Sequence, residues 1–488
     1  MRQNYNKYLP YIWPVVLVIF LLAAYSMNSI LGYLVSFVLF IVALASPKKA
    51  ILLLLLYVPI RPFLIELNPS LRLAGDLMIA GAFLNVVWQS RHNLRSLLSF
   101  HVFEYGYFAF LIIGSFSAIV NRIEIGPIVL QLRAFIIFYL IYYIVKRLDI
   151  KKEDIIQVLH VFIWTTLLII IQALIEKLSI RGLFMPEAWK QLPLSSKNRV
   201  RIYGMVGNPN VLGIYLGFAY FLFYYAKKYI LHYNKVWMQI LQYVTIGIFV
   251  LTYSRGTWIG FFIIALVYVI ASRNFVLFKT IVMQVAIALV VIVLPINLLT
   301  NFIEDTSIGQ EKVQNIQKFD VGGSSGFVDR VGSTFSDDTI TGSQSSGRLF
   351  IVKKGFEVFK DYPIMGTGFS TFGDSASLSR ISPISAKYEI DRTFYSDNQY
   401  IQIIVQTGIL GVISFAVFLL GMLYALVKIK RSKLTKLMIG IVFGAFFMGL
   451  VYNLWEADVF TLLFFAFLAV TLNSQSKFQS IHEDLTRS

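Results

Sequence analysis

The 488-residue chain contains no cysteine and only five histidines, and just 14% of its residues are charged. Without cysteine, the protein forms no disulfide and carries out no thiol chemistry. The histidines show no metal-ligand spacing; they are His92, His101, His160, His232 and His482. A soluble globular domain carries about 25% charged residues, so the low charge excludes an ordinary soluble fold. The sequence also lacks a glycine-rich phosphate loop and a catalytic triad.

Long hydrophobic segments make up most of the chain. Its residues are 57% hydrophobic and 16% aromatic, and the mean hydropathy is +0.70. The sequence therefore predicts an all-α, polytopic membrane protein with about fourteen helices, and twelve as the lower bound, because about 20 apolar residues cross a bilayer. The predicted segments lie near residues 11–27, 30–45, 50–65, 74–89, 102–120, 127–145, 155–176, 208–226, 236–252, 256–271, 279–299, 400–427, 434–452 and 456–472.

The charges of the short loops predict the orientation of the chain in the cell membrane. With the N-terminus inside, the inner loops carry Lys48, Lys49, Arg91, Arg95, Lys146, Arg147, Lys151, Lys152, Lys227, Lys228, Lys235, Arg273, Lys279 and the cluster from Lys428 to Lys436. The short outer loops carry only Arg61, Arg72, Arg122 and Arg255. Because cytoplasmic loops are enriched in Lys and Arg, we expect both termini inside. The first segment is expected to be a retained anchor, since no small-residue cleavage site follows it.

Two longer outer segments, residues 177–203 and about 300–397, are also basic. Long loops cross the membrane regardless of charge, so these are either solvated faces or a surface for an anionic partner. The net charge of +17 does not indicate a nucleic-acid partner, because about half of the basic residues lie in the short inner loops that set the topology and most of the rest lie in the outer loops.

The second outer segment is divided into parts of different composition. Residues Gly322 to Gly347 are rich in Gly, Ser and Thr, a composition that predicts mobility. Ser346 is expected to cap a helix from Arg348 to about Lys360, which Pro363 ends. This amphipathic helix either lies in the membrane interface or packs on the tops of the spanning helices. We divide the chain into residues 1–176, 177–299, 300–397 and 398–488.

Asp397 and Asn398 stand where the second outer segment enters the span near 400–427. An ionisable group at such a position is a candidate functional residue. A carboxylate there can accept a proton from a hydroxyl group, and burial near hydrocarbon would raise its pKa towards the working range. We therefore predict a catalytic role for Asp397, with Asn398 orienting the acceptor.

Several arginines near the outer surface are candidates for binding an anionic substrate. Arg255 lies in a tight outer turn, Arg199 and Arg201 precede an Asn-Pro-Asn turn, and Arg348 opens the amphipathic helix. The guanidinium group stays charged and binds phosphate through paired hydrogen bonds. The alternative for Arg255 is snorkelling to the membrane interface.

Arg133 lies inside a predicted span, about 9 Å below its start. A cation at that depth must face protein or water. It either contacts a phosphate or forms an ion pair between helices, with Glu124 or Glu456 as the expected partner.

Two further sets of residues have a structural and a functional interpretation. Asn208, Pro209 and Asn210 form a helix entry, or Asn210 lines an acceptor site. In the last outer loop, Glu456 and Asp458 could bind sugar hydroxyls beside Trp455, or form a plain loop with an interfacial aromatic.

Four motifs occur in a fixed order over roughly the C-terminal 60% of the chain. They are GNPNVLGIYL (residues 207–216), TYSRGTWIGF (252–261), SGRLFIVKKGFEVFKDYPIMGTGFSTF (346–372) and DNQYIQIIVQTGILG (397–411). In these motifs the chain resembles the O-antigen ligase and Wzy-type polymerase superfamily and, within it, the teichuronic acid polymerases of Gram-positive bacteria.

The resemblance implies a GT-C-like membrane fold and transfer of an undecaprenyl-diphosphate-linked glycan at the outer membrane face, without nucleotide cofactor or metal. It also implies that other polysaccharide-assembly proteins are partners. Ligases of this kind carry His where this chain has Asp397, which favours polymerisation over transfer to lipid A. The alternatives are a flippase for lipid-linked glycans, which needs a polar path through the bilayer, and a ligase that transfers finished polymer to a wall or lipid acceptor.

Overall fold

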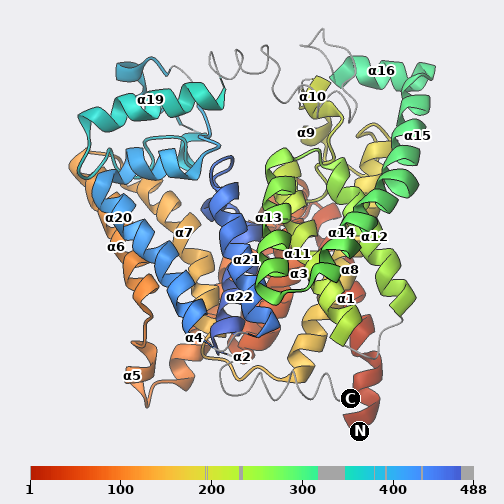
Figure 1. Ribbon diagram of the computed structural model, residues 1–488, viewed down its shortest axis with the longest axis horizontal. Helices are drawn as coiled ribbons and strands as arrows, with labels where there is room; N and C mark the ends of the chain where they lie inside the picture. Colours follow the sequence, from red (N-terminus) through yellow and green to blue (C-terminus); the bar gives the residue numbers. More distant parts are fainter. Residues whose placement is uncertain are drawn as a thin grey trace.

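The computed structural model describes residues 2–192, 194, 196–229, 235–316, 347–378, 380–390, 393–429 and 432–473. Over these residues the protein is all-helical and contains no strand, which confirms the predicted fold class. Figure 1 shows the long helices side by side in one bundle, with short helices and loops over the end drawn at the top. We call this the upper end of the bundle and the opposite one, where α1 begins, the lower end.

The first part of the chain forms the helices up to α8. They are α1 (Arg2–Tyr25), α2 (Ser29–Ala45), α3 (Pro47–Leu67), the 3-10 turn η1 (Pro69–Leu73), α4 (Ala74–Gln89), α5 (Leu94–Leu97), α6 (Val102–Val120), α7 (Ile125–Val145) and α8 (Lys152–Leu178). The side chains of Asn28 and Ser46 cap α2 and α3 by accepting hydrogen bonds from backbone N–H groups, which allows the chain to reverse within a few residues.

The second part runs from α9 to α22. Its elements are α9 (Glu187–Lys190), α10 (Ser196–Arg199), α11 (Pro209–Tyr229), α12 (Lys235–Leu251), α13 (Arg255–Ser272), α14 (Phe275–Ala288), the π-helical turn η2 (Leu289–Val293), α15 (Leu294–Glu304), α16 (Ser307–Ile316), α19 (Arg348–Asp361), η4 (Ala376–Leu378), η5 (Ser385–Tyr388), α20 (Gln399–Lys428), α21 (Lys433–Met448), η6 (Leu454–Glu456) and α22 (Asp458–Asn473).

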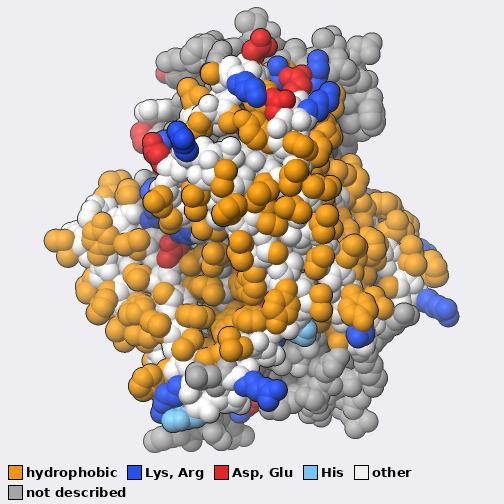
Figure 2. Space-filling view, turned by 90° about the vertical axis from the view of Figure 1, so that its left-hand side faces the viewer, with side chains coloured by type: hydrophobic (Ala, Val, Ile, Leu, Met, Phe, Trp, Pro, Cys, Tyr) orange, Lys and Arg blue, Asp and Glu red, His pale blue; other side chains and the backbone are white. Residues whose placement is uncertain are grey.

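Each of the predicted membrane segments overlaps one of these helices, except the segment near 279–299, which covers α14, η2 and α15. Of the described helices, eight are long and apolar enough to cross a membrane, and four shorter ones are also apolar. Figure 2 shows a broad hydrophobic band around one face of the molecule, with charged side chains gathered mostly above and below it. The protein is therefore a membrane protein, and the number of crossings stays a prediction.

The segment predicted near 400–427 is not one straight helix. Gly408 has φ +58° and ψ −161° inside α20, and the N–H of Ile409 donates to the carbonyl of Pro363 at 2.8 Å. Figure 1 shows the first turns of α20 lying across the top of the bundle before the helix descends. Residues 399–407 therefore carry the start of α20 about 13 Å across the bundle, and only 409–428 descend through it.

The amphipathic helix α19 packs on this upper part of α20. Ile351, Gly355 and Val358 are buried, and a Cβ at Gly355 would lie 2.4 Å from Ile401 and 3.2 Å from Val405. Packing on the tops of the helices is thus the alternative that the structure shows.

The predicted capping residue of α19, Ser346, lies outside the described residues, as does most of the segment predicted to be mobile, Gly322 to Gly347. The N-cap of the helix is Gly347, which has no side-chain cap.

Candidate active site

A cavity of about 280 Å³ opens at the upper end between α11, α13, α19 and α21. We call it the arginine cavity, because Arg201, Arg255 and Arg348 all line it. These residues come from a loop, the start of α13 and the start of α19. Among the described residues that line the cavity there is no carboxylate. Three like charges around one space repel each other, so the arrangement favours a bound anion.

Arg201 is held in place by the Asn-Pro-Asn turn. Its Nη2 donates to Asn210 Oδ1 at 2.8 Å, and its Nε donates to the carbonyl of Thr252 at 3.0 Å. Asn210 Oδ1 also accepts from Ser254 Oγ at 2.7 Å, while Asn208 Oδ1 accepts from the N–H of Asn210 at 2.8 Å. Asn208 therefore caps the helix, and Asn210 joins Arg201 to the turn before α13.

A buried ion pair supports the loop that carries Arg201. Glu176 Oε1 accepts from Arg181 Nη1 at 2.8 Å, and Glu176 Oε2 accepts from the N–H of Gly204 at 2.6 Å. Glu176 and Arg181 are 1% and 5% exposed. The ion pair keeps the buried Glu176 carboxylate charged and in place, and the N–H groups of Tyr203 and Gly204 that donate to it hold the loop against the end of α8.

Arg255 is the first residue of α13. The turn before it is so tight that Tyr253 adopts φ +49°, a conformation that is uncommon for a tyrosine. Arg255, Gly256 and Thr257 all line the arginine cavity. The N–H groups at a helix N-terminus attract anions, so this turn offers an anion both a guanidinium and a favourable helix end.

Asp397 lies beside Arg348. Its Oδ2 is 3.4 Å from Arg348 Nη2, and the two side chains are 38% and 48% exposed. Burial raises the pKa of Asp397, while the charges of Arg348 and Arg201 act to lower it, and the net shift is upward from the ordinary value. Asp397 has φ +48°, a left-handed conformation that Asp tolerates better than most residues.

Asn453, which the sequence analysis did not single out, holds the turn around Asp397. Its Oδ1 accepts from Ser396 Oγ at 2.7 Å and from the N–H of Asn398 at 3.0 Å, and its Nδ2 donates to the carbonyl of Gly373 at 2.8 Å. Asn453 is fully buried. An asparagine in a loop between two helices gives no sequence signal of such a role, because its partners are distant in the chain.

Asn398 is the N-cap of α20. Its Oδ1 accepts from the N–H groups of Tyr400 at 3.1 Å and Ile401 at 3.0 Å. Its side-chain oxygen is therefore used in capping the helix.

Two of the predicted arginines do not line the arginine cavity. Arg199 pairs with Glu304 at 2.7 Å and its side chain is 5% exposed. Arg133 donates from Nε and Nη2 to both oxygens of Asp76, at 2.8 and 2.7 Å. The expected partners of Arg133 were wrong, because Asp76 on α4 packs nearer to it than Glu124 or Glu456.

Glu456 is buried within the fold. Its Oε1 accepts from Gln131 Nε2 at 2.8 Å and also from Gln402, and its Oε2 accepts from the N–H and Oγ of Ser375 at 2.8 and 2.5 Å. Burial and the charge of Asp374 raise the pKa of Glu456. These contacts tie η6 to α7 and α20.

The neighbours of Glu456 are also engaged. Trp455 is 2% exposed and packs against Phe418 and Phe464 with ring centroids 5.0 Å away, so it lies neither at the membrane interface nor open to a sugar. Asp458 pairs with Arg61 at 2.7 Å. Among the described residues there is no group of three or more His, Asp and Glu arranged to hold a metal ion.

Fold and site together define a polytopic membrane protein with a cationic cavity at one end of its helix bundle. Residues 240–416 match the model of the family Wzy_C, described as O-Antigen ligase. This match supports the O-antigen ligase and Wzy-type superfamily and a role in polysaccharide biosynthesis on lipid-linked glycans. The matched stretch contains Arg255, Arg348 and Asp397. No curated protein matches the chain.

Proposed function

We propose that the protein is a glycosyltransferase that polymerises undecaprenyl-diphosphate-linked oligosaccharide repeats at the outer face of the cell membrane. The product is an anionic cell-wall polysaccharide of the teichuronic acid type. The observation that carries the proposal is the meeting of Arg201, Arg255 and Arg348 around one cavity, with Asp397 beside Arg348. The match to the O-antigen ligase family supports the same reaction class.

The three arginines bind the diphosphate of the donor. Arg201 and Arg255 approach from the loop before α11 and from the N-terminus of α13, and Arg348 approaches from α19. Guanidinium groups form charge-assisted hydrogen bonds to phosphate oxygens. When the bond between the sugar and the diphosphate breaks, the same groups stabilise the negative charge that builds up on the departing lipid diphosphate. No cofactor is needed for this step.

Asp397 acts on the acceptor. Its carboxylate takes the proton from a sugar hydroxyl, the hydroxyl oxygen attacks the anomeric carbon of the donor, and the bond to the diphosphate oxygen breaks. Asn398 Nδ2 orients the acceptor oxygen. A single displacement of this kind inverts the configuration at the anomeric carbon.

Donor binding strengthens the base. The charges of Arg348 and Arg201 act to lower the pKa of Asp397. A diphosphate bound to these arginines offsets their charge and adds negative charge of its own, and both changes raise the pKa further. Asp397 is therefore the stronger base when a donor is present.

The proposed orientation puts the upper end outside and both termini in the cytoplasm. The basic short loops support it, since Lys48, Lys146 and Lys151 all lie at the lower end, where Lys48 pairs with Asp154 at 2.5 Å and Lys146 donates to the carbonyl of Ser99 at 2.7 Å. Cytoplasmic loops favour such residues.

The test supplies short lipid-linked repeats to the purified protein in liposomes and measures ladders of product. We expect ladders from the unaltered protein and from Arg380→Ala, because Arg380 is an upper-end arginine paired with Glu124 at 2.8 Å and does not line the arginine cavity. We expect no ladders from Arg255→Ala. Repeats that cross the bilayer unchanged would instead indicate a flippase, and transfer of one finished polymer to a wall or lipid acceptor would indicate a ligase.

A further inference from the structure

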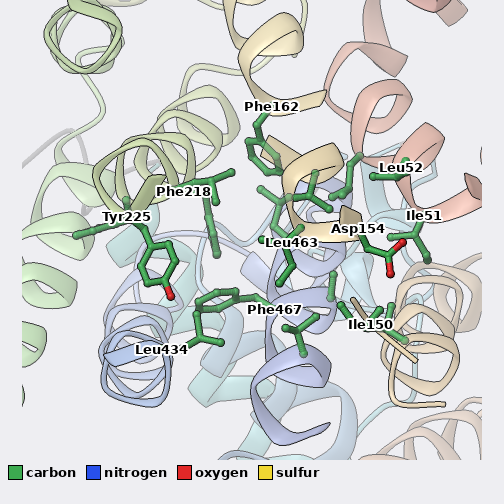
Figure 3. A pocket seen from close by; sticks show the side chains of 18 of the residues that line it. Ile51, Leu52, Ile150, Asp154, Phe162, Phe218, Tyr225, Leu434, Leu463 and Phe467 are labelled. Atoms are coloured by element: carbon green, nitrogen blue, oxygen red, sulfur yellow. The ribbon is translucent and has the colours of Figure 1, made fainter. Parts of the chain in front are cut away.

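A second large cavity, of about 200 Å³, lies in the lower half of the bundle. It is enclosed by α3, α7, α8, α11, α21 and α22 and lined almost entirely by apolar side chains. Figure 3 shows Phe218, Leu463 and Phe467 around this space, with the Tyr225 hydroxyl and the Asp154 carboxylate at opposite sides of it. We call it the lower cavity. Nothing in the proposed glycosyl transfer uses it.

A narrow space of about 20 Å³ between α11, α13 and α21 lies between the two larger cavities and shares lining residues with both. The residues that it shares with the arginine cavity are Ile214, Thr257 and Met448. The residues that it shares with the lower cavity are Phe218, Phe221 and Ile441. The three spaces therefore follow one another along the bundle.

One face of α11 follows this path from end to end. Asn210 lines the arginine cavity, Ile214 and Gly217 line the narrow space, and Phe221 and Tyr225 line the lower cavity. Residues three or four apart lie on one face of a helix. From Asn210 to Tyr225 the helix rises about 22 Å, which is the length of the path.

Glycines keep the narrow space open. Gly217 lines it, and a Cβ at this position would lie 3.5 Å from Phe261. A Cβ at Gly213 would lie 2.6 Å from Thr257 Oγ1. A larger side chain at either position would therefore fill the space between α11 and α13.

We propose that the hydrocarbon chain of the lipid-linked donor enters this path, with its diphosphate at the arginines and its end in the lower cavity. The inference rests on the proposed function. The length of the path decides the occupant: half of a bilayer core is about 15 Å thick, so the acyl chain of an outer-leaflet phospholipid ends above Tyr225, at the far end of the lower cavity, whereas an undecaprenyl chain extends to it. The narrow space holds little more than one water-sized sphere, so Phe218 and Phe221 must rotate as the chain enters.

The test compares two donors that carry the same repeat, one on an undecaprenyl and one on a short farnesyl diphosphate. Ala466 lines the lower cavity, and Ala286 on α14 is exposed, so Ala466→Phe fills the path and Ala286→Phe is the matched control. We expect Ala466→Phe to raise KM for the long donor about tenfold, the usual scale for crowding an apolar pocket, and to leave KM for the short donor unchanged. The control should change neither.

Equal changes for the two donors, or an unchanged KM for the long donor in Ala466→Phe, would overturn the proposal. If the unaltered protein makes no product from either donor, the proposed function fails, and the path is then tested without catalysis. Undecaprenyl diphosphate with a photoreactive group at its far end should label peptides from the lower halves of α11, α21 and α22. Label confined to the exposed helices α14 and α15, or label in the lower cavity only from a photoreactive phospholipid, would refute it.

Discussion

Replacing Asp397 with Asn separates the chemistry of this residue from its shape. Asn has the same size and tolerates the left-handed conformation, φ +48°, in which Asp397 is held. It keeps an oxygen that Arg348 can contact but cannot take a proton from the acceptor. General-base catalysis contributes about 10²- to 10⁴-fold, so kcat should fall by that factor, or about 3 to 5 kcal/mol of barrier.

The substitution should leave stability almost unchanged. The Asp397–Arg348 contact is long, at 3.4 Å, and both side chains are more than a third exposed. Ion pairs of this kind contribute about 0 to 1 kcal/mol, so the thermal unfolding temperature of Asp397→Asn should stay close to that of the unaltered protein. Any loss of glycosyl transfer in a single-turnover assay then reflects the missing base.

The activity should depend on pH through the ionisation of Asp397. Burial raises the pKa of Asp397 in the folded protein, so activity is present above that raised pKa and is lost as pH falls through it. Ionisation of Asp397 costs the folded state a little stability over the same interval as pH rises. Asp397→His should recover part of the activity, with its acid limb moved towards about 6.5, because His also tolerates this backbone conformation.

Two results would refute this reasoning. One is an Asp397→Asn protein that keeps more than about a tenth of the original kcat, since a base worth less than tenfold is outside the usual range. The other is an acid limb that stays in place in Asp397→His, which would mean that another group titrates.

Four further predictions follow from the packing around the site. Arg255→Lys should raise KM for the donor about 10- to 150-fold in steady-state assays, since it loses a forked, charge-assisted hydrogen bond. Asn453→Ala should lower kcat about 10- to 100-fold with a smaller change in KM, because the turn that positions the base loosens. Arg133→Met should lower the unfolding temperature, and adding Asp76→Leu should restore it with activity retained, because the ion pair is removed as a unit. Glu456→Ala should destabilise the fold by about 2 to 5 kcal/mol in denaturation experiments, since it leaves several buried donors without an acceptor.

Each of these has an opposing outcome and a control. Arg380→Lys changes an upper-end arginine outside the arginine cavity and should leave KM alone; an equal effect from both lysine variants would point to general surface charge. If Asn453→Ala lowers the free energy of unfolding by as much as it raises the activation free energy, the role of Asn453 is structural only. Loss of donor binding in the Arg133 and Asp76 double variant would show that Arg133 takes part in binding the donor. A Glu456→Ala protein that unfolds like the unaltered one would contradict the buried network.

The family match covers the part of the chain that contains the turn before α13, α19 and the bent start of α20. It does not include Arg201 or Asn453, although the structure packs the first against Thr252 and Asn210 and the second against Ser396. The site is therefore built from the matched stretch and from the helices on either side of it.

The sequence by itself predicted the helices. Long hydrophobic runs identify segments that only a helix can carry through a bilayer, and each predicted segment lies largely in helix. It also singled out Asp397, Arg201, Arg255 and Arg348, because the position of a charged residue at the end of an apolar segment can be read from the neighbouring sequence alone.

Only the tertiary structure decided which of the candidates meet. Arg133 and Arg199 have the same chemistry as Arg255, yet ion pairs with Asp76 and Glu304 remove them from the cavity. Because α20 bends at Gly408, its first turns lie across the upper end of the bundle and place Asp397 beside Arg348. Hydrophobic patterning does not distinguish these outcomes, because it records how each residue meets the membrane, whereas the site depends on how helices far apart in the chain pack against one another.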